Sequence, residues 1–144
     1  MQYIVDVDGA SRGNPGPAAA GIVLHPEVGN RREVGIYLGT ATNNVAEYLA
    51  AIVGLKLALQ AGATRVTLRS DSQLLVRQLT GEYAVKASHL RGLCASLRGM
   101  LAQFREYRCE HVPREENVIA DRLANAALDA AALANGLVPG QLVP

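Results

Sequence analysis

The chain has 144 residues, a length that fits one domain able to bury a hydrophobic core without disulfides. Its longest apolar stretch, residues 48–55, is far shorter than the roughly 20 residues that a membrane-spanning helix needs. The formal net charge is only +1, which excludes a strongly basic protein whose overall charge would indicate a nucleic-acid partner. We therefore expect a compact cytoplasmic protein that does not enter a membrane.

The two cysteines, Cys94 and Cys109, are too few for a disulfide framework and lack the spacing of metal ligands. In a cytoplasmic protein such residues are usually reduced and partly buried. We therefore expect two free thiols, and a disulfide between them is the less favoured alternative.

The first part of the chain predicts three strands. Apolar runs bounded by Gly, Pro and Asn cover residues 2–7, 18–24 and 33–38. Residues 26–32 join the second and third of these runs as an antiparallel hairpin.

The rest of the chain alternates helices with strands. Apolar residues at helical spacing and glycine stop signals predict helices over residues 44–60, 72–79, 88–104 and 117–134. Strands are expected over residues 66–70 and 106–112. This order predicts an α/β fold, a mixed sheet flanked by helices, with residues 1–134 as a single domain and 135–144 as a short unstructured tail.

Two aspartates lie at the ends of predicted strands that can be neighbours. Asp8 ends the first strand, and Asp71 follows the fourth. A helix lies between these strands in the sequence, so the two strands can run parallel, and parallel neighbours bring their carboxyl ends to one edge of the sheet. We therefore expect the carboxylates of Asp8 and Asp71 to converge at that edge.

Two further carboxylates lie near the starts of predicted helices. Glu47 belongs to a helix with few charges that leaves the loop beside the same sheet edge, and Asp121 lies near the start of the last helix. Each also has an ordinary structural explanation. Asn44 and Glu47 have the spacing of a capping box, and an aspartate near a helix start favours the helix dipole. For Glu47 the two interpretations are evenly balanced on the helix pattern alone.

Four carboxylates at one site would repel each other unless a cation is present, and no nearby run of Lys or Arg supplies it. A hard divalent ion would, because Mg²⁺ takes oxygen ligands and is often completed by substrate phosphate. Two such ions about 3.5 to 4 Å apart can stabilise both the attacking and the leaving oxygen in phosphodiester cleavage. The acidic set therefore indicates a Mg²⁺ site, with Mn²⁺ as the alternative ion.

The motifs DGASRGNPGP, TNNVAEYLA, SDSQLL and HVPREENVIADRLAN, in this order and spacing, resemble those of compact type 1 ribonucleases H over residues 2–129. The resemblance implies a ribonuclease H-like fold with a five-stranded mixed sheet in the order 3-2-1-4-5. It also implies an endonuclease that uses two metal ions to cut the RNA strand of RNA/DNA hybrids, leaving 5′-phosphate and 3′-hydroxyl ends. The family's metal-binding and catalytic acids correspond to Asp8, Glu47, Asp71 and Asp121.

The resemblance also assigns residues to binding of the hybrid. Its pocket for a DNA phosphate corresponds to Asn14 and Thr42. Its contacts to RNA 2′-hydroxyl groups correspond to Ser11, Asn14, Asn43, Asn44 and Gln73. An amide can donate to or accept from a 2′-hydroxyl, the group that distinguishes RNA from DNA. Helix capping by Asn43 and Asn44 and a turn at Asn14 are alternative roles that can hold together with substrate binding.

Two segments depart from the family pattern. Many members carry an additional basic helix and loop that grip the DNA strand, whereas residues 81–93 here contain only Lys86 and Arg91 as lysine or arginine, so we expect weak binding. The loop before the last helix often carries a mobile histidine, and here it reads PREEN. His111 falls inside a predicted strand and Arg114 falls in the loop, so we expect Arg114 to assist the reaction electrostatically.

Asp6 matches none of the family's acids, although by strand period it shares a face with Asp8, and we expect it to be a polar residue near the site. Two alternatives to the endonuclease remain: a catalytically weak hybrid-binding module, or another nuclease of the ribonuclease H-like superfamily. A hybrid-binding module could lose one of the four acids, and another nuclease of the superfamily would not need asparagines that contact 2′-hydroxyls. The expected partner is an RNA/DNA hybrid, bound by a monomer.

Overall fold

The structure is a computed structural model that describes residues 1–134, 137–138 and 141–142. The main strands are β1 (Gln2–Ser11), β2 (Gly16–Pro26), β3 (Arg32–Ala41), β4 (Arg65–Ser70) and β5 (Glu106–His111). The helices are α1 (Asn43–Gln60), α2 (Gln73–Leu79), α3 (Ser88–Leu101) and α4 (Val118–Ala134), with a 3₁₀ turn, η1 (Arg114–Glu116), before α4. Every strand and helix expected within residues 1–134 is present, in the expected order.

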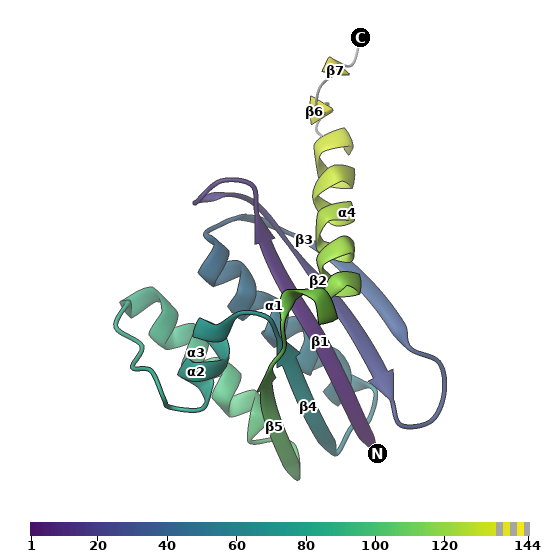
Figure 1. The fold of residues 1–144 in the computed structure, drawn as a ribbon, viewed down its shortest axis with the longest axis vertical. Helices are drawn as coiled ribbons and strands as arrows, with labels where there is room; N and C mark the ends of the chain where they lie inside the picture. The colour runs from purple at the N-terminus through teal and green to yellow at the C-terminus, as the bar shows by residue number, and fades with distance from the viewer. Residues whose placement is uncertain (135–136, 139–140, 143–144) are drawn as a thin grey trace.

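The five strands form one mixed sheet in the order β3-β2-β1-β4-β5 (Figure 1). β1 runs parallel to β4, with Asp6 opposite Arg69 and Val7 opposite Ser70. Asp8 directly follows Val7 and Asp71 directly follows Ser70, so both aspartates lie at the same edge of the sheet. The predicted fold class, strand order and convergence of the two strand ends are confirmed.

Alternation along β1 separates the hydrophobic core from the site. Val5 and Val7 are fully buried in the main core with residues of α1, including Leu55. Asp6 and Asp8 occupy the intervening positions and therefore face the opposite side of the sheet. α1 packs against the core side, and α4 crosses β2 and β3 on the other side, as Figure 1 shows.

Two glycines let helices approach the sheet closely enough to bring their acids to its edge. A Cβ atom added to Gly9 would lie 2.3 Å from the carbonyl carbon of Ala46, next to Glu47 on α1. A Cβ atom added to Gly21, which pairs with Asp8 in the sheet, would lie 1.8 Å from the carbonyl oxygen of Ala120 on α4. Any side chain at either position would push the helix, and its acid, away from β1.

Several expected boundaries differ from the structure. β1 continues past Val7 to Ser11 because residues 9–11 pair with residues 18–20 of β2. α3 ends at Leu101 instead of residue 104, because Ala102 closes the helix and the following turn returns the chain to β5. None of the helices in the described residues is long and apolar enough to cross a membrane.

The prediction of an unstructured tail is wrong for four of its residues. β6 (Leu137–Val138) and β7 (Gln141–Leu142) pair antiparallel as a separate two-stranded unit. Each of these strands has only two residues, too few to show the alternating apolar pattern that predicts a strand. The other tail residues lie outside the described residues, and the division of the chain into domain and tail stays a prediction.

Candidate active site

Three carboxylates from three different elements meet at the end of the sheet. Asp8 of β1, Glu47 of α1 and Asp71, which follows β4, each place one carboxylate oxygen within 4.8 Å of the other two. Asp121, in the first turn of α4, lines the same cleft and is close enough to Asp8 to raise its pKa. The four acids that the sequence singled out therefore lie together.

Burial and mutual repulsion make two of these acids hard to ionise. Burial, the charges of Glu47 and Asp71, and the neighbouring Asp121 together raise the pKa of Asp8 to about 9, with burial as the largest cause. Burial also raises the pKa of Glu47 to about 7, although the hydrogen bond from Gly9 and the charge of Arg114 oppose this shift. The fold therefore holds these carboxylates so close together that ionising all of them without a cation is unfavourable.

The donor set fits a hard divalent cation. All the converging donors are carboxylate oxygens, the ligand type that Mg²⁺ prefers, and no cysteine or histidine belongs to the three-residue group. A cation at this position would lower both raised pKa values by stabilising the ionised carboxylates. The arrangement therefore has the chemistry of a Mg²⁺ or Mn²⁺ site and lacks the nitrogen and sulfur donors of a typical zinc site.

Glu47 is held by β1, and it does not cap its own helix. The backbone N–H of Gly9 donates a hydrogen bond of 2.6 Å to Oε1 of Glu47. The N-cap of α1 is Thr42, whose Oγ1 accepts a hydrogen bond from the backbone N–H of Val45 at 3.2 Å. The capping-box interpretation of Asn44 and Glu47 is therefore wrong, because α1 begins one residue earlier than expected.

A cleft of about 360 Å³ opens over the carboxylates. Eight residues predicted from the sequence line it: Asp8, Ser11, Asn43, Asn44, Glu47, Asp71, Arg114 and Asp121. Four further lining residues were not predicted: Gly9, Ala10, Ser72 and Asn125.

Hydrogen bonds order the polar wall of this cleft. The backbone N–H of Ser11 donates to Oδ1 of Asn43 at 3.0 Å, and the backbone N–H of Asn43 donates to Oδ1 of Asn14 at 3.2 Å. Asn43 and Asn14 thus link the β1–β2 turn to the start of α1. Helix capping by the side chain of Asn43 or Asn44 is not observed, because Thr42 performs it.

Three predicted substrate-binding residues lie outside the lining of the cleft. Oδ1 of Asn14 accepts a hydrogen bond from the backbone N–H of Asn43, Thr42 caps α1, and Gln73 is an exposed residue at the first position of α2. Ser72, the N-cap of α2, lines the cleft instead. Contacts of these side chains with a nucleic acid stay predictions.

Asn125 is the most informative residue that the sequence interpretation missed. Its Nδ2 donates to the backbone oxygen of Asp121 at 3.0 Å and to the carboxylate Oδ1 of Asp121 at 3.3 Å. The signal was present in the sequence, because residues four apart are neighbours on a helix surface. Asn125 therefore orients the Asp121 carboxylate.

Arg114 lies at the cleft and His111 does not, as their expected positions in a loop and in a strand indicated. His111 is the exposed last residue of β5, paired with Ser70, and it does not line the cleft. Arg114 lines the cleft and is close enough to Glu47 to lower its pKa. The expected irregular loop is instead a single 3₁₀ turn that begins at Arg114.

Asp6, two residues before Asp8 on β1, forms an ion-pair cluster with Arg69 and His25. Its Oδ1 accepts from Nε of Arg69 at 2.6 Å, and its Oδ2 lies 3.1 Å from Nη2 of Arg69 and 2.9 Å from Nε2 of His25. The two-fold contact with Arg69 joins β1 to β4 just before Asp8 and Asp71. Asp6 is thus near the site as expected, with a cross-strand partner that the sequence did not reveal.

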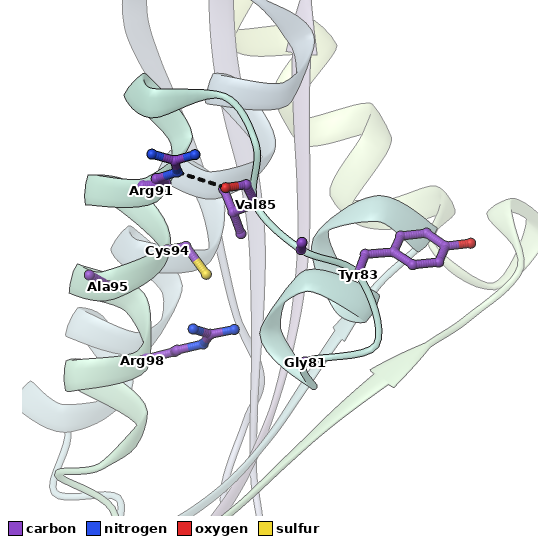
Figure 2. A pocket seen from close by; sticks show the side chains of 8 residues that line it. Gly81, Tyr83, Val85, Arg91, Cys94, Ala95 and Arg98 are labelled. Carbon is purple, nitrogen blue, oxygen red and sulfur yellow. Dashed lines mark hydrogen bonds between the residues drawn. The ribbon is translucent and has the colours of Figure 1, made fainter.

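A second cavity, of about 340 Å³, lies between α3 and the segment that joins it to α2 (Figure 2). Arg91 donates to the backbone oxygens of Val85 and Lys86 at 2.9 and 3.2 Å. Arg98 donates to the backbone oxygen of Gln78 at 2.7 Å. Arg91 thus fastens the short α2–α3 segment to α3, and Arg98 joins α3 to α2.

The sequence matches the family model described as reverse transcriptase-like over residues 6–127. It is 45% identical over 136 residues to the protein named Bifunctional protein Rv2228c of Mycobacterium tuberculosis, covering 92% of this chain and 37% of that protein. The chain thus spans little more than a third of the length of this curated relative.

Two solved structures have the same fold and substantial sequence identity. The crystal structure of RNase H1 from Halobacterium salinarum has a TM-score of 0.87 and 45% identity, over 90% of this chain and 99% of that one. The structure of LC11-RNase H1 in complex with RNA/DNA hybrid has a TM-score of 0.83 and 40% identity, over 90% and 98%. Together with the family match and the four converging carboxylates, these similarities show that the chain belongs to the type 1 ribonuclease H family.

Proposed function

We propose that the protein is a metal-dependent endonuclease that hydrolyses the RNA strand of RNA/DNA hybrids and leaves 5′-phosphate and 3′-hydroxyl ends. The observation that carries this proposal is the meeting of Asp8, Glu47 and Asp71 within 4.8 Å, with Asp121 beside Asp8, at the base of an open polar cleft. A carboxylate set of this kind serves phosphodiester cleavage when divalent ions and a substrate phosphate complete it. The LC11 relative with an RNA/DNA hybrid bound supports the choice of substrate.

Asp8, Glu47, Asp71 and Asp121 would hold two Mg²⁺ ions, with Mn²⁺ as a possible substitute. Bound divalent ions supply activation of the attacking water and stabilisation of the leaving 3′-oxygen. The chain's own part is to fix the ligands: Gly9 holds one oxygen of Glu47, and Asn125 holds the Asp121 carboxylate. These hydrogen bonds restrict the carboxylates before substrate arrives, so less ordering is needed on binding.

The polar wall of the cleft supports recognition of RNA. Ser11, Asn43 and Asn44 line the cleft beside the carboxylates, and the amide nitrogen of Asn43 is not used by the hydrogen bond from Ser11, which Oδ1 accepts. An amide N–H and a backbone carbonyl can satisfy a 2′-hydroxyl, which both donates and accepts. DNA lacks this group, so the same wall would leave its polar atoms unpaired against a DNA strand.

Arg114 would act as an electrostatic aid in this reaction. It lines the cleft, and its charge acts on Glu47. A guanidinium remains protonated near neutral pH, so it cannot exchange a proton as a histidine can, but it can donate paired hydrogen bonds to phosphate oxygens. Through such hydrogen bonds Arg114 would stabilise negative charge on the phosphate or assist release of the cleaved product.

The decisive experiment compares end-labelled RNA/DNA, RNA/RNA and DNA/DNA duplexes, each incubated with the protein in Mg²⁺, Mn²⁺ or chelator. We expect cleavage of the RNA strand of the hybrid in either ion and none in chelator, by a protein that sediments as a monomer. Binding of the hybrid without cleavage would identify a binding module. Cleavage of DNA/DNA at the rate of the hybrid would identify a different nuclease of the superfamily.

A further inference from the structure

Asn117 joins three parts of the candidate active site. Its backbone N–H donates to the backbone oxygen of Arg114 at 3.0 Å, and its own backbone oxygen accepts from the N–H of Asp121 at 3.1 Å. Its side-chain Nδ2 donates to the backbone oxygen of Val7 at 2.9 Å, and only 2% of the residue is exposed. One buried residue thus contacts the turn of Arg114, the helix of Asp121 and the strand of Asp8.

The side-chain nitrogen of Asn117 hydrogen-bonds to β1, whereas its side-chain oxygen has no partner among the described residues. An asparagine just before a helix usually accepts a backbone N–H of the first turn through Oδ1. In the described part of the chain, Oδ1 of Asn117 is buried and has no hydrogen-bond partner. A buried unpaired oxygen is costly, and it needs an explanation. Serine or aspartate would cap the helix without this cost, but neither offers an amide N–H to Val7.

The bond to Val7 bears on the distance between two acids. Val7 directly precedes Asp8, and Asp121 lies one helical turn after Asn117. Asp121 is exposed, and it does not belong to the three carboxylates that lie within 4.8 Å of one another. Its position relative to Asp8 therefore depends on how the start of α4 is fixed to β1, and the Asn117–Val7 hydrogen bond is a direct link between the two elements.

We propose that Asn117 is a positioning residue, which holds Asp121 at the distance from Asp8 at which both carboxylates can bind the same divalent ion. This proposal rests on the proposed function of the site. It explains why an amide with an unpaired oxygen occupies a helix start, because its nitrogen is needed on β1. It also predicts that the effect of changing Asn117 is transmitted through Asp121.

The test uses Asn117→Ser, which supplies a helix-capping hydroxyl but is too short to replace the bond to Val7. Val66→Ala, a core change near the start of β4 and away from Asp71, is the control for loss of stability. We expect Asn117→Ser to lower turnover about tenfold or more and to raise the Mg²⁺ concentration needed for half-maximal rate, with the Michaelis constant for hybrid nearly unchanged. Val66→Ala should change neither quantity at a temperature where both variants are folded.

Two further readouts separate positioning from general stability. Asn117→Ser combined with Asp121→Asn should lose no more activity than Asp121→Asn alone, because both changes act on the same ligand. Without hybrid, the rise in unfolding temperature caused by Mn²⁺ should be smaller in Asn117→Ser than in the parent. If the serine variant does not fold, Asn117→Asp, which has nearly the same shape and caps helices well, replaces it in each experiment.

Additive losses in the double variant, or an Asn117→Ser protein with the parent's turnover and Mn²⁺ response, would overturn the proposal. The Mn²⁺ measurement needs no hybrid and no catalysis. It therefore still tests the role of Asn117 if the parent proves not to cleave hybrid, in which case only the proposed function fails.

Discussion

The backbone N–H of Gly9 donates a 2.6 Å hydrogen bond to Oε1 of Glu47, and thereby connects β1 to α1 directly beside Asp8. This contact is possible because Gly9 has no side chain: a Cβ there would lie 2.3 Å from the carbonyl carbon of Ala46. A bond from a backbone N–H to a carboxylate is stronger than one between neutral groups. The pair therefore fixes Glu47 at the site and opposes the rise in its pKa.

Replacement of Gly9 by alanine should displace α1 and Glu47 together. We expect Gly9→Ala to lower the unfolding temperature and to abolish hydrolysis of hybrid RNA, because backbone atoms of α1 cannot move away without carrying Glu47 with them. Gly92→Ala is the matched control, since a Cβ at Gly92, inside α3, meets no atom within 4 Å. That change should stabilise the protein by roughly 0.5–1 kcal/mol. Equal activity in the two variants would contradict the role given to the Gly9–Glu47 contact.

The raised pKa of Asp8 makes the stability of the metal-free protein depend on pH. The pKa of Asp8 is about 9 in the folded protein, against an ordinary value of 3.8. Between these values the folded state binds more protons than the unfolded state, so the free energy of unfolding falls as pH rises through this window. We expect the unfolding temperature in chelator to decrease from about pH 5 to about pH 9, measured by calorimetry.

Asp8→Asn should flatten this pH profile and raise the unfolding temperature at alkaline pH in chelator, because asparagine carries no charge to repel Glu47 and Asp71. Mg²⁺ or Mn²⁺ should stabilise the parent more than the variant. Asp129→Asn makes the same chemical change at an exposed position of α4 and should keep the parent's pH dependence. An Asp8→Asn profile as steep as the parent's between about pH 7 and about pH 9, above the pKa of Glu47, would show that another group causes the decrease.

We expect replacement of Arg114 and replacement of His111 to have different effects on turnover. Arg114 lines the cleft, so Arg114→Ala should lower turnover by on the order of tenfold. His111 ends β5 with an exposed side chain outside the cleft, so His111→Ala should change turnover little. Steady-state kinetics under saturating hybrid measures both. A folded His111→Ala protein with reduced turnover, beside an unaffected Arg114→Ala protein, would reverse the assignment.

Binding of the hybrid should be weak and sensitive to salt. The α2–α3 segment is short, and its neighbouring arginines already bind backbone oxygens: Arg91 those of Val85 and Lys86, and Arg98 that of Gln78. Few phosphates are then neutralised, and each contributes a slope of about 0.9 to the logarithmic salt dependence in a B-form duplex.

A lysine-rich helix inserted near Lys86 should lower the Michaelis constant more than it alters turnover, and it should steepen the salt dependence. An insert of equal length with glutamine in place of lysine is the control. Tight binding of the parent at high salt would contradict the prediction.

The fold was predictable because its signals are local and repeated. Apolar strands such as the one that contains Val5 and Val7 alternate with helices, and the four motifs placed their acids at strand ends and helix starts. The carboxylates of Asp8 and Asp71 converge because β1 and β4 are parallel neighbours, a consequence of topology that strand order alone predicts.

The remaining features depend on contacts between distant residues, which no local pattern encodes. Asp6 pairs with Arg69, 63 positions away, and Asn117 bonds to Val7, 110 positions away. The start of α1 moved by one residue because Thr42 performs the capping, and this shift removed the capping-box explanation for Glu47. Tertiary contacts therefore decide which of several acceptable local roles each polar residue takes.

The most direct test of the metal-dependent reaction is the cleavage of a labelled RNA/DNA hybrid by the parent, Asp71→Asn and Asp129→Asn, each in Mg²⁺ and in excess chelator, with identification of the product ends. We expect the parent and Asp129→Asn to cut the RNA strand in Mg²⁺ and to leave 5′-phosphate ends, and we expect Asp71→Asn to fold without cutting. Cleavage in chelator, or by Asp71→Asn at the parent's rate, would contradict the claim that the converging carboxylates hold the ions on which hydrolysis depends.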